Sequence, residues 1–303
     1  MKNVTFVESI PVQNTLGECI LAQPGTAFIW WTDIQNCQLY RYNWKTKEIM
    51  QWTTFERLSS FGFVKLERGA PETPLQLIAA FESGFALYKP ETGQVEWLAQ
   101  PETHLPCNRF NDGRVDRQGR FWAGCMVEGT AMDSNKDFLA SLYRLDQGVS
   151  SKMADGINIS NSICWSLDSK IMYFADSAKQ SIYAYDFDEM SGNISNRRIF
   201  VRTCDGASPD GSVVDAEGYL WNAEWKGHRI VRYAPNGDIN LVLPLPVSQP
   251  TCLTFGGADM SVLFVTSARE GLSVEEFERQ PMAGNVLIYK TDFCGVSEQQ
   301  YVV

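Results

Sequence analysis

The sequence predicts an all-β fold, a six-bladed β-propeller with four-stranded antiparallel blades. Six short runs rich in aromatic and β-branched residues recur along the 303 residues. Each run is followed closely by a second run, and four of these six alternate apolar with polar or small residues, as half-buried strands do. Helical periodicity is nearly absent. Repeats of roughly 40 to 50 residues, each worth about four strands, are typical of propellers.

The repeated runs can be placed in order. The first set covers residues 28–31, 77–80, 121–123, 172–175, 220–223 and 262–265, with steps of 47, 44, 51, 48 and 42 between matched positions. Their partners are residues 39–42, 86–88, 142–145, 182–185, 230–233 and 286–289. Turn signals at 45–47, 91–93 and 235–237 then precede a further strand. We therefore predict one propeller domain over residues 1–303. The alternative, a large β-sandwich, does not need six evenly spaced copies.

Three segments fall outside the repeat. Residues 1–7 have the pattern of a strand without a partner in the first repeat. We expect this strand to complete the last blade beside the C-terminal strands, which would close the ring and remove an exposed edge. Residues 270–279 are predicted to form a short surface helix. Residues 127–137, polar and rich in small side chains, are predicted to form a long loop over one face that could act as a lid.

Composition excludes several classes of protein. The net charge is −10 and no Lys/Arg cluster appears, which argues against nucleic-acid binding. The eight cysteines form no CxxC or CxxH pair, which argues against a thiolate zinc site. No run approaches 18 apolar residues and the N-terminus lacks an apolar signal segment, so we expect a cytoplasmic protein that does not bind membranes. We expect a monomer or a weak dimer whose partner is a small molecule.

Four polar residues hold similar places in four repeats. In a propeller the innermost strand of each blade starts at one mouth of the central channel, and the hairpin turn after it marks its far end. The four residues are Glu18, Asn111, Asn161 and Asp210, which lie seven, eight, eight and eight positions before the turn residues Gly25, Gly119, Ser169 and Gly218. We therefore expect these side chains to converge at the axis.

Two carboxylates and two amides brought together need a reason, because buried like charges repel each other. A divalent cation removes the repulsion, and oxygen atoms of Asp, Glu and Asn are hard ligands that suit such an ion. Neither of the two histidines is at one of these positions. The alternative is that each residue caps a strand or bonds to a neighbouring loop.

The chain resembles the SMP-30/gluconolactonase/LRE family along essentially its whole length. The matching segments are Leu16-Gly17-Glu18, residues 109–113, residues 119–124, Ile159-Ser160-Asn161, Pro209-Asp210-Gly211 with residues 215–218, and residues 266–271. The resemblance implies that Glu18, Asn161 and Asp210 hold one divalent ion, which could be Ca²⁺, Mg²⁺, Mn²⁺ or Zn²⁺. It also implies that Arg109 and Asn111 contact a substrate, and that the substrate is a sugar lactone.

The chain departs from the family pattern at two places. Ser162 follows Asn161 where the family commonly has glycine, a change we expect to be tolerated. A loop carboxylate that contacts sugar in some members falls near Glu128 and Gly129. Glu128 is therefore a candidate substrate-binding residue, and the alternative is a solvated loop acid.

The predicted reaction is metal-dependent hydrolysis of a sugar lactone to the open-chain acid. The metal would polarise the lactone carbonyl, Asp210 would serve as general base, and Asn111 would help to stabilise the oxyanion. Arg109 would donate to ring hydroxyls or to a carboxylate, unless it forms a salt bridge with Asp112. Alternative functions are a metal-dependent phosphotriesterase on the same frame, a calcium-binding regulatory protein, and a propeller scaffold for protein partners.

Overall fold

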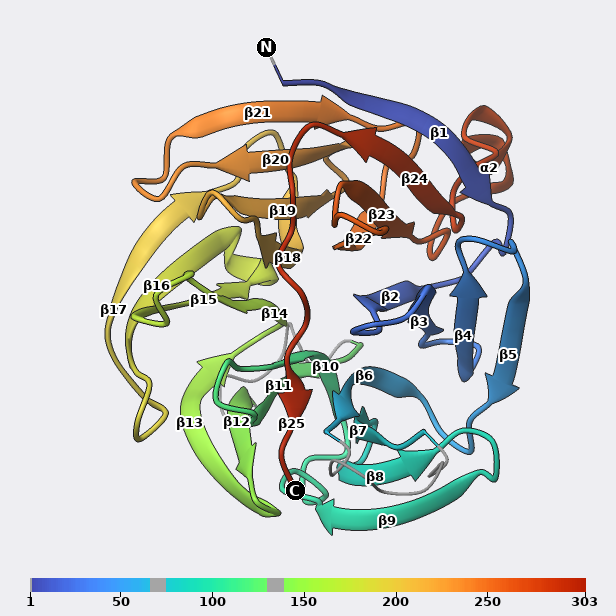
Figure 1. Cartoon of the computed structure of the whole chain (residues 1–303). Coiled ribbons are helices and arrows are strands. Elements are labelled where there is room, and N and C mark those ends of the chain that lie inside the picture. Colours follow the sequence, from blue (N-terminus) through green and yellow to red (C-terminus); the bar gives the residue numbers. More distant parts are fainter. Residues whose placement is uncertain (1, 66–74, 130–138) are drawn as a thin grey trace.

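Six antiparallel sheets stand around a central axis, as the computed structural model shows for residues 2–65, 75–129 and 139–303 (Figure 1). This confirms the six-bladed propeller. Blades one to three are β2 (Gly17–Ala22), β3 (Phe28–Asp33), β4 (Gln38–Asn43), β5 (Ile49–Thr53); β6 (Leu58–Val64), β7 (Leu77–Phe81), β8 (Phe85–Lys89), β9 (Gln94–Ala99); and β10 (Asn108–Val115), β11 (Phe121–Val127), β12 (Ala140–Asp146), β13 (Val149–Ile157). Blades four to six are β14 (Ser160–Trp165), β15 (Ile171–Asp176), β16 (Ser181–Asp188), β17 (Asn193–Arg202); β18 (Ser208–Val214), β19 (Leu220–Trp225), β20 (Arg229–Tyr233), β21 (Ile239–Pro244); and β22 (Pro250–Gly256), β23 (Val262–Ser267), β24 (Val286–Thr291), β1 (Val4–Ile10).

The repeated runs are the second and third strands of the blades. All six aromatic runs fall in second strands, from β3 in the first blade to β23 in the last. Their partners fall in third strands, from β4 to β24. The second strands are almost fully buried and the third strands largely so, for example β3 and β4 in the first blade. The innermost strands, such as β2 and β6, are just as buried, but the aromatic runs belong to the second strands.

The hairpin turns have the predicted conformation. Gly119 and Gly218 adopt φ values of 89° and 84°, which favour glycine. In each turn the preceding aspartate, Asp116 or Asp215, accepts two backbone N–H groups and the indole N–H of the next strand's tryptophan. These turns therefore fix where the first strand of each blade ends, and so where it begins.

The N-terminal strand closes the ring as predicted. β1 pairs antiparallel with β24, from Val4 opposite Thr291 to Ile10 opposite Val286. The last blade is thus built from both ends of the chain, and β1 covers the outer edge of β24.

The predicted surface helix forms over α2 (Val274–Arg279), four residues shorter at its start than expected. Ser273 caps the helix, since its hydroxyl accepts from the backbone N–H of Glu276 while the Glu276 carboxylate accepts from the backbone N–H of Ser273. Of the predicted loop over residues 127–137, residues 130–137 lie outside the described part of the chain.

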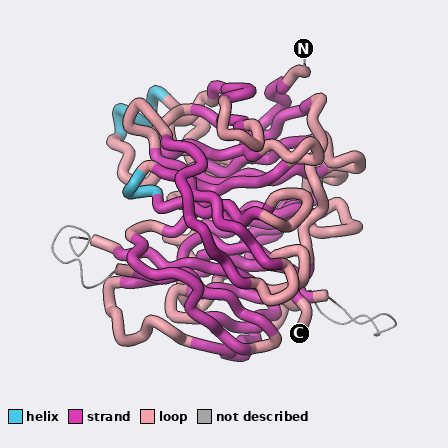
Figure 2. The backbone as a smooth tube through the Cα atoms, turned by 90° about the vertical axis from the view of Figure 1, so that its left-hand side faces the viewer, coloured by secondary structure: helices cyan, strands magenta, loops and turns pink. Residues whose placement is uncertain are grey.

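The C-terminal segment was not predicted from the sequence. It crosses the front of the ring in Figure 1 and adds β25 (Gln300–Tyr301) in parallel to β6, the innermost strand of the second blade. Glu298 in this segment forms a buried ion pair with Arg114, with 3.0 Å between carboxylate and guanidinium atoms. The helical segments lie on the opposite face (Figure 2). One mouth of the channel is therefore covered by the chain itself.

Within the described residues, no helix is both long and apolar enough to cross a membrane.

Candidate functional site

Glu18 and Asn161 are placed by the same local device in blades one and four. Asp33, at the end of β3, accepts the backbone N–H groups of residues 15 and 16 at 2.9 and 3.0 Å. Asp176, at the end of β15, accepts those of residues 158 and 159 at 3.2 Å. Each aspartate thus anchors the chain just before an innermost strand. The residue that follows each site residue then turns to positive φ, 46° at Cys19 and 60° at Ser162.

Asn111 and Asp210 lie inside β-bulges. The pairing of β10 with β11 skips from Phe110 to Gly113, and that of β18 with β19 skips from Pro209 to Ser212. β2 and β14 carry the same irregularity, but there Glu18 and Asn161 are the last paired residues before it. A bulge re-aims a side chain that a regular strand would direct elsewhere. The four residues that the spacing treats as near-equivalent therefore occupy two neighbouring positions of a shared irregularity.

All four side chains nevertheless line one cavity of about 340 Å³, together with Arg109. The convergence expected from the spacing is confirmed. The remaining lining residues are Leu16, Met126, Ile159, Ser177, Ala178, Gly206, Ser208, Trp225, Lys226 and Glu270. The wall is mixed, with polar groups from several blades and a few apolar side chains. Such a wall suits a small polar ligand.

The two carboxylates in this cavity, Glu18 and Asp210, have raised pKa values. Burial, followed by the charge of nearby Asp112, raises the pKa of Glu18 to about 8. Burial and the charge of Glu18 raise the pKa of Asp210 well above its ordinary value. Neither carboxylate forms an ion pair among the described residues, and Asp210 Oδ1 is buried without a hydrogen-bond partner. Burial therefore shifts both groups toward their protonated forms.

Asp112 is not the partner of Arg109, so that alternative is wrong. Its carboxylate accepts the backbone N–H groups of Ile163 at 3.0 Å and Gly113 at 2.9 Å. Burial raises its pKa as well. It therefore adds to the negative character of the site and leaves Arg109 to other partners.

The two amides are held by a hydrogen-bond chain. Asn111 Nδ2 donates to Asn161 Oδ1 at 3.2 Å and to the Ser160 carbonyl at 2.9 Å. Asn161 Nδ2 donates to Ser177 Oγ at 2.8 Å, and Ser177 in turn donates to the carbonyl of Pro209, next to Asp210. Ser177, in η2 (Ser177–Lys179), was missed because a lone serine carries no signal in the sequence. Asn161 Oδ1 thus accepts one hydrogen bond and keeps a second lone pair, in a residue that lines the same cavity as both carboxylates.

We call Glu18, Asn161 and Asp210 the axial cluster. Its donors are oxygen atoms only, and one of them has no partner, so the set fits a hard divalent ion. Within the described residues there is no cluster of three or more His, Cys, Asp or Glu side chains suited to a metal. The axial cluster has only two carboxylates and an amide, and it would leave coordination positions for water or substrate.

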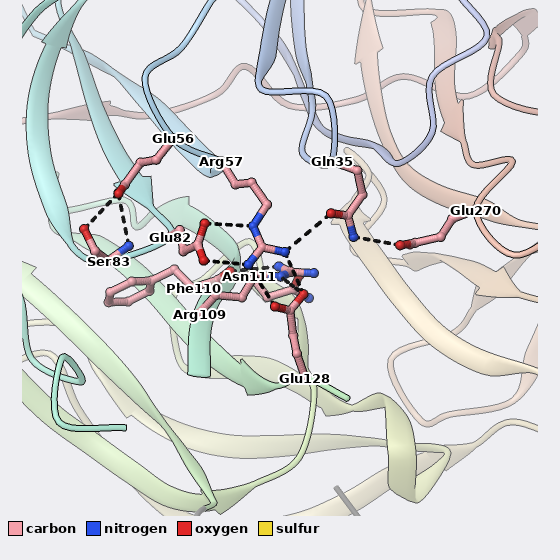
Figure 3. Close-up of polar contacts among 10 residues, drawn as sticks. All are labelled: Gln35, Glu56, Arg57, Glu82, Ser83, Arg109, Phe110, Asn111, Glu128 and Glu270. Atoms are coloured by element: carbon pink, nitrogen blue, oxygen red, sulfur yellow. Dashed lines mark hydrogen bonds and ion pairs between the residues drawn. The ribbon is translucent and has the colours of Figure 1, made fainter. Parts of the chain in front are cut away.

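Glu128 is neither a solvated loop acid nor part of the cavity wall. Its carboxylate accepts Arg109 Nε at 2.8 Å and two nitrogens of Arg57 at 2.9 and 2.8 Å (Figure 3). Arg57 also forms two hydrogen bonds with Glu82, at 2.8 and 2.6 Å. We call Arg57, Glu82, Arg109 and Glu128 the rim cluster.

Arg57 was missed by the analysis of the sequence. It precedes β6 in the second blade, where the sequence analysis identified no hairpin turn from which to count back. Its partner Glu128 is 71 positions away in the sequence. Only the packing of blade two against blade three brings the two together.

The fold and the site together define a six-bladed propeller whose innermost strands bring two carboxylates and two amides to one cavity. The chain belongs to the SMP-30/gluconolactonase/LRE-like family, whose model matches residues 16–269.

Individual relatives cover nearly the whole chain. Regucalcin of Oryctolagus cuniculus is 36% identical over 300 residues, which are 98% of this chain and 97% of the relative. L-arabinolactonase of Azospirillum brasilense is 33% identical over 292 residues, 95% of this chain and 93% of the relative. Among solved structures, a calcium-binding protein, regucalcin, from Agrobacterium tumefaciens matches with a TM-score of 0.89 and 28% identity, covering 98% of each chain.

Proposed function

We propose that this protein hydrolyses a sugar lactone to the open-chain acid with the help of one divalent ion held by the axial cluster. The observation that carries the proposal is the pair of buried carboxylates, Glu18 and Asp210, that line one cavity and form no ion pair among the described residues. Family membership and the likeness to an L-arabinolactonase support the same substrate class. We also infer a monomer or weak dimer acting on a free small molecule in the cytoplasm.

The ion would be held by Glu18, Asn161 and Asp210, and when bound it would supply Lewis-acid polarisation of the lactone carbonyl. Its positive charge would also return the two carboxylates to their ionised form, by lowering pKa values that burial has raised. Asp210 then has a basic oxygen for the proton of an attacking water. This water adds to the carbonyl carbon, and the ring C–O bond breaks as the leaving oxygen is protonated.

Arg109 and Asn111 have distinct tasks in this scheme. Arg109 lines the cavity and its side chain is only 3% exposed, so a hydrogen bond from it to a substrate hydroxyl is shielded from water. Asn111 uses both ends of its amide inside the protein, accepting from Arg109 and donating to Asn161. Its task is therefore to join the substrate-binding arginine to the axial cluster. The expected direct hydrogen bond from Asn111 to the oxyanion would require its Nδ2 to leave a present partner.

The test is a panel of aldonolactones assayed with metal-stripped protein to which Mg²⁺, Mn²⁺, Ca²⁺ or Zn²⁺ is added singly. We expect no turnover above the spontaneous rate without an ion, and restored turnover with several hard ions. Full activity after exhaustive chelation would contradict the metal mechanism. Paraoxon in the same panel tests the phosphotriesterase alternative.

A second candidate is calcium binding without catalysis, which is favoured by the likeness to the calcium-binding regucalcin of Agrobacterium tumefaciens. The same axial cluster would serve as the site. Calcium binding with no turnover of any lactone, whichever ion is present, would select this candidate.

A further inference from the structure

Arg57 makes two forked contacts at the edge of the proposed substrate site. Its Nε and Nη2 donate to the Glu82 carboxylate, and its Nη1 and Nη2 donate to the Glu128 carboxylate (Figure 3). Forked arginine–carboxylate pairs fix direction as well as distance. The second pair joins blade two to the end of β11 in blade three. Arg57 therefore sets the position of the Glu128 carboxylate from outside the cavity.

Glu128 passes this constraint on to Arg109. Its Oε1 accepts Arg109 Nε, while Arg109 Nη1 donates to the carbonyl of Phe110 at 2.9 Å and to Asn111 Oδ1 at 2.8 Å. Three of the bonding directions of the guanidinium are thus taken. Nη2 has no hydrogen-bond partner among the described residues, and it is the nitrogen left for a ligand.

The charges of the rim cluster show why Glu128 needs both Arg57 and Arg109 to hold its carboxylate in place. Hydrogen bonds from Arg57 lower the pKa of Glu82. For Glu128, burial alone would raise the pKa, but bonds from Arg57 and Arg109 outweigh burial and lower it. If Arg57 is removed, Glu128 Oε2 loses its partner and the carboxylate can turn about its side chain. The acceptor of Arg109 Nε would then no longer have a fixed position, and the Arg109 guanidinium could move with it.

We propose that Arg57 is a positioning residue, which orients the substrate-binding guanidinium of Arg109 through the carboxylate of Glu128. The proposal rests on the proposed function only for its kinetic effect. Arg57 does not line the cavity, so it acts on the ligand through Arg109. Replacing Arg57 should therefore weaken substrate affinity, because a misplaced binding group weakens the complex while the axial cluster stays intact.

The test is a double-mutant cycle on Arg57 and Arg109, assayed on a neutral aldonolactone with saturating ion. We expect Arg57→Met to raise KM roughly tenfold with kcat within roughly twofold of wild type. Arg57→Lys keeps the charge but loses the forked geometry, so its KM should lie between those of wild type and Arg57→Met. In an Arg109→Met background, Arg57→Met should change KM by less than roughly twofold, since its effect runs through Arg109.

Arg198→Met is the matched control. Arg198 forms an ion pair with Asp186 at 2.7 Å on the outer strands of blade four. Its removal changes the net charge by the same amount as Arg57→Met, and we expect KM to stay at the wild-type value. We expect Arg57→Met to lower the thermal midpoint more than Arg198→Met does, because the Arg57 side chain is 20% exposed and bonds two carboxylates whereas that of Arg198 is 46% exposed. KM is therefore compared at a temperature at which both variants are fully folded.

A measurement independent of activity separates this proposal from the proposed function. The Nε–H cross-peak of Arg109, assigned by its loss in Arg109→Met, should shift or broaden in Arg57→Met and stay in place in Arg198→Met. An unmoved cross-peak, or a KM effect of Arg57→Met that persists undiminished without Arg109, would overturn the proposal. If wild-type protein turns over no lactone, the proposed function fails and the cross-peak alone decides the role of Arg57.

Discussion

Two groups of carboxylates lie on the open face of the propeller and behave in opposite ways. In the rim cluster, Glu82 and Glu128 have lowered pKa values because Arg57 and Arg109 donate to them. In the axial cluster, Glu18 and Asp210 have raised pKa values because they are buried near each other without a cation. The difference teaches that the carboxylates of the rim have cationic partners within the chain, whereas those of the axis form no ion pair among the described residues, which is the feature on which the proposed ion site rests.

The largest effect that sharpens this comparison is expected at Asp210. Asp210→Asn keeps an oxygen ligand but removes the charge and the basic oxygen. Turnover of a lactone should fall by roughly 10²- to 10⁴-fold at saturating ion, the usual worth of a general base. Ion affinity should fall but remain measurable by calorimetry.

Glu18→Gln is the control for Asp210→Asn. It removes one ligand charge and no proposed base, so excess ion should largely restore its turnover. If excess ion restores both variants equally, Asp210 is a ligand and not the base. Wild-type turnover in Asp210→Asn at ordinary ion levels would mean that the site is assigned wrongly.

The pH dependence of stability should have opposite signs in the two clusters. In ion-free protein the native state binds more protons than the unfolded state between the unfolded pKa of Glu18, 4.5, and its folded pKa, about 8. The axial contribution to stability is therefore present at low pH and lost as pH rises through this window. The lowered pKa values of Glu82 and Glu128 mean that the rim contribution is present above pH 4.5 and lost as pH falls below it.

Thermal unfolding between pH 3 and 9, with chelator and with saturating ion, measures both signs. We expect the ion to abolish the loss of stability on the alkaline side and to leave the loss on the acid side unchanged. An ion-free protein whose stability rises steadily from pH 5 to 8 would contradict the account of the axial cluster.

The smallest effect is expected at Ser162, which supports the axis through the backbone. Its φ of 60° favours glycine, but its hydroxyl donates to the carbonyl of Asp210. Asn222 donates to the same carbonyl at 3.0 Å, so this oxygen keeps a partner in Ser162→Gly. Glycine adopts this φ without strain, and this gain should nearly offset the lost hydrogen bond. The free energy of unfolding in urea should therefore change by no more than about 1 kcal/mol. A larger loss would show that the hydroxyl has a role that Asn222 cannot replace.

The sequence predicted the axis far better than the rim. Glu18, Asn111, Asn161 and Asp210 could be brought together because each is tied to a hairpin turn in its own blade, and the blades repeat. All four strands have an irregular pairing at this place, and the spacing did not show that Glu18 and Asn161 come just before it whereas Asn111 and Asp210 lie inside it.

The rim cluster and the crossing of the C-terminal segment could not be predicted from the sequence, for a common reason. Arg57 meets Glu128, and Glu298 meets Arg114, through pairings between segments that no repeat relates. Nothing local in the sequence marks such pairs. Helix α2 began later than predicted because Ser273 caps it, a signal present in the sequence but not used.

The most direct test of the central claim is calorimetric titration of ion-free protein with Ca²⁺ or Mn²⁺ at pH 7 in buffers of different ionisation enthalpy. Because burial raises the pKa of Asp210 and raises that of Glu18 to about 8, we expect binding of one ion at pH 7 to release protons. Glu82→Gln should bind and release protons as wild type does, whereas Glu18→Gln should bind more weakly and release fewer. Ion binding at one site without proton release, or binding that Glu82→Gln weakens and Glu18→Gln does not, would contradict the claim that the axial cluster is the part of this protein that a cation completes.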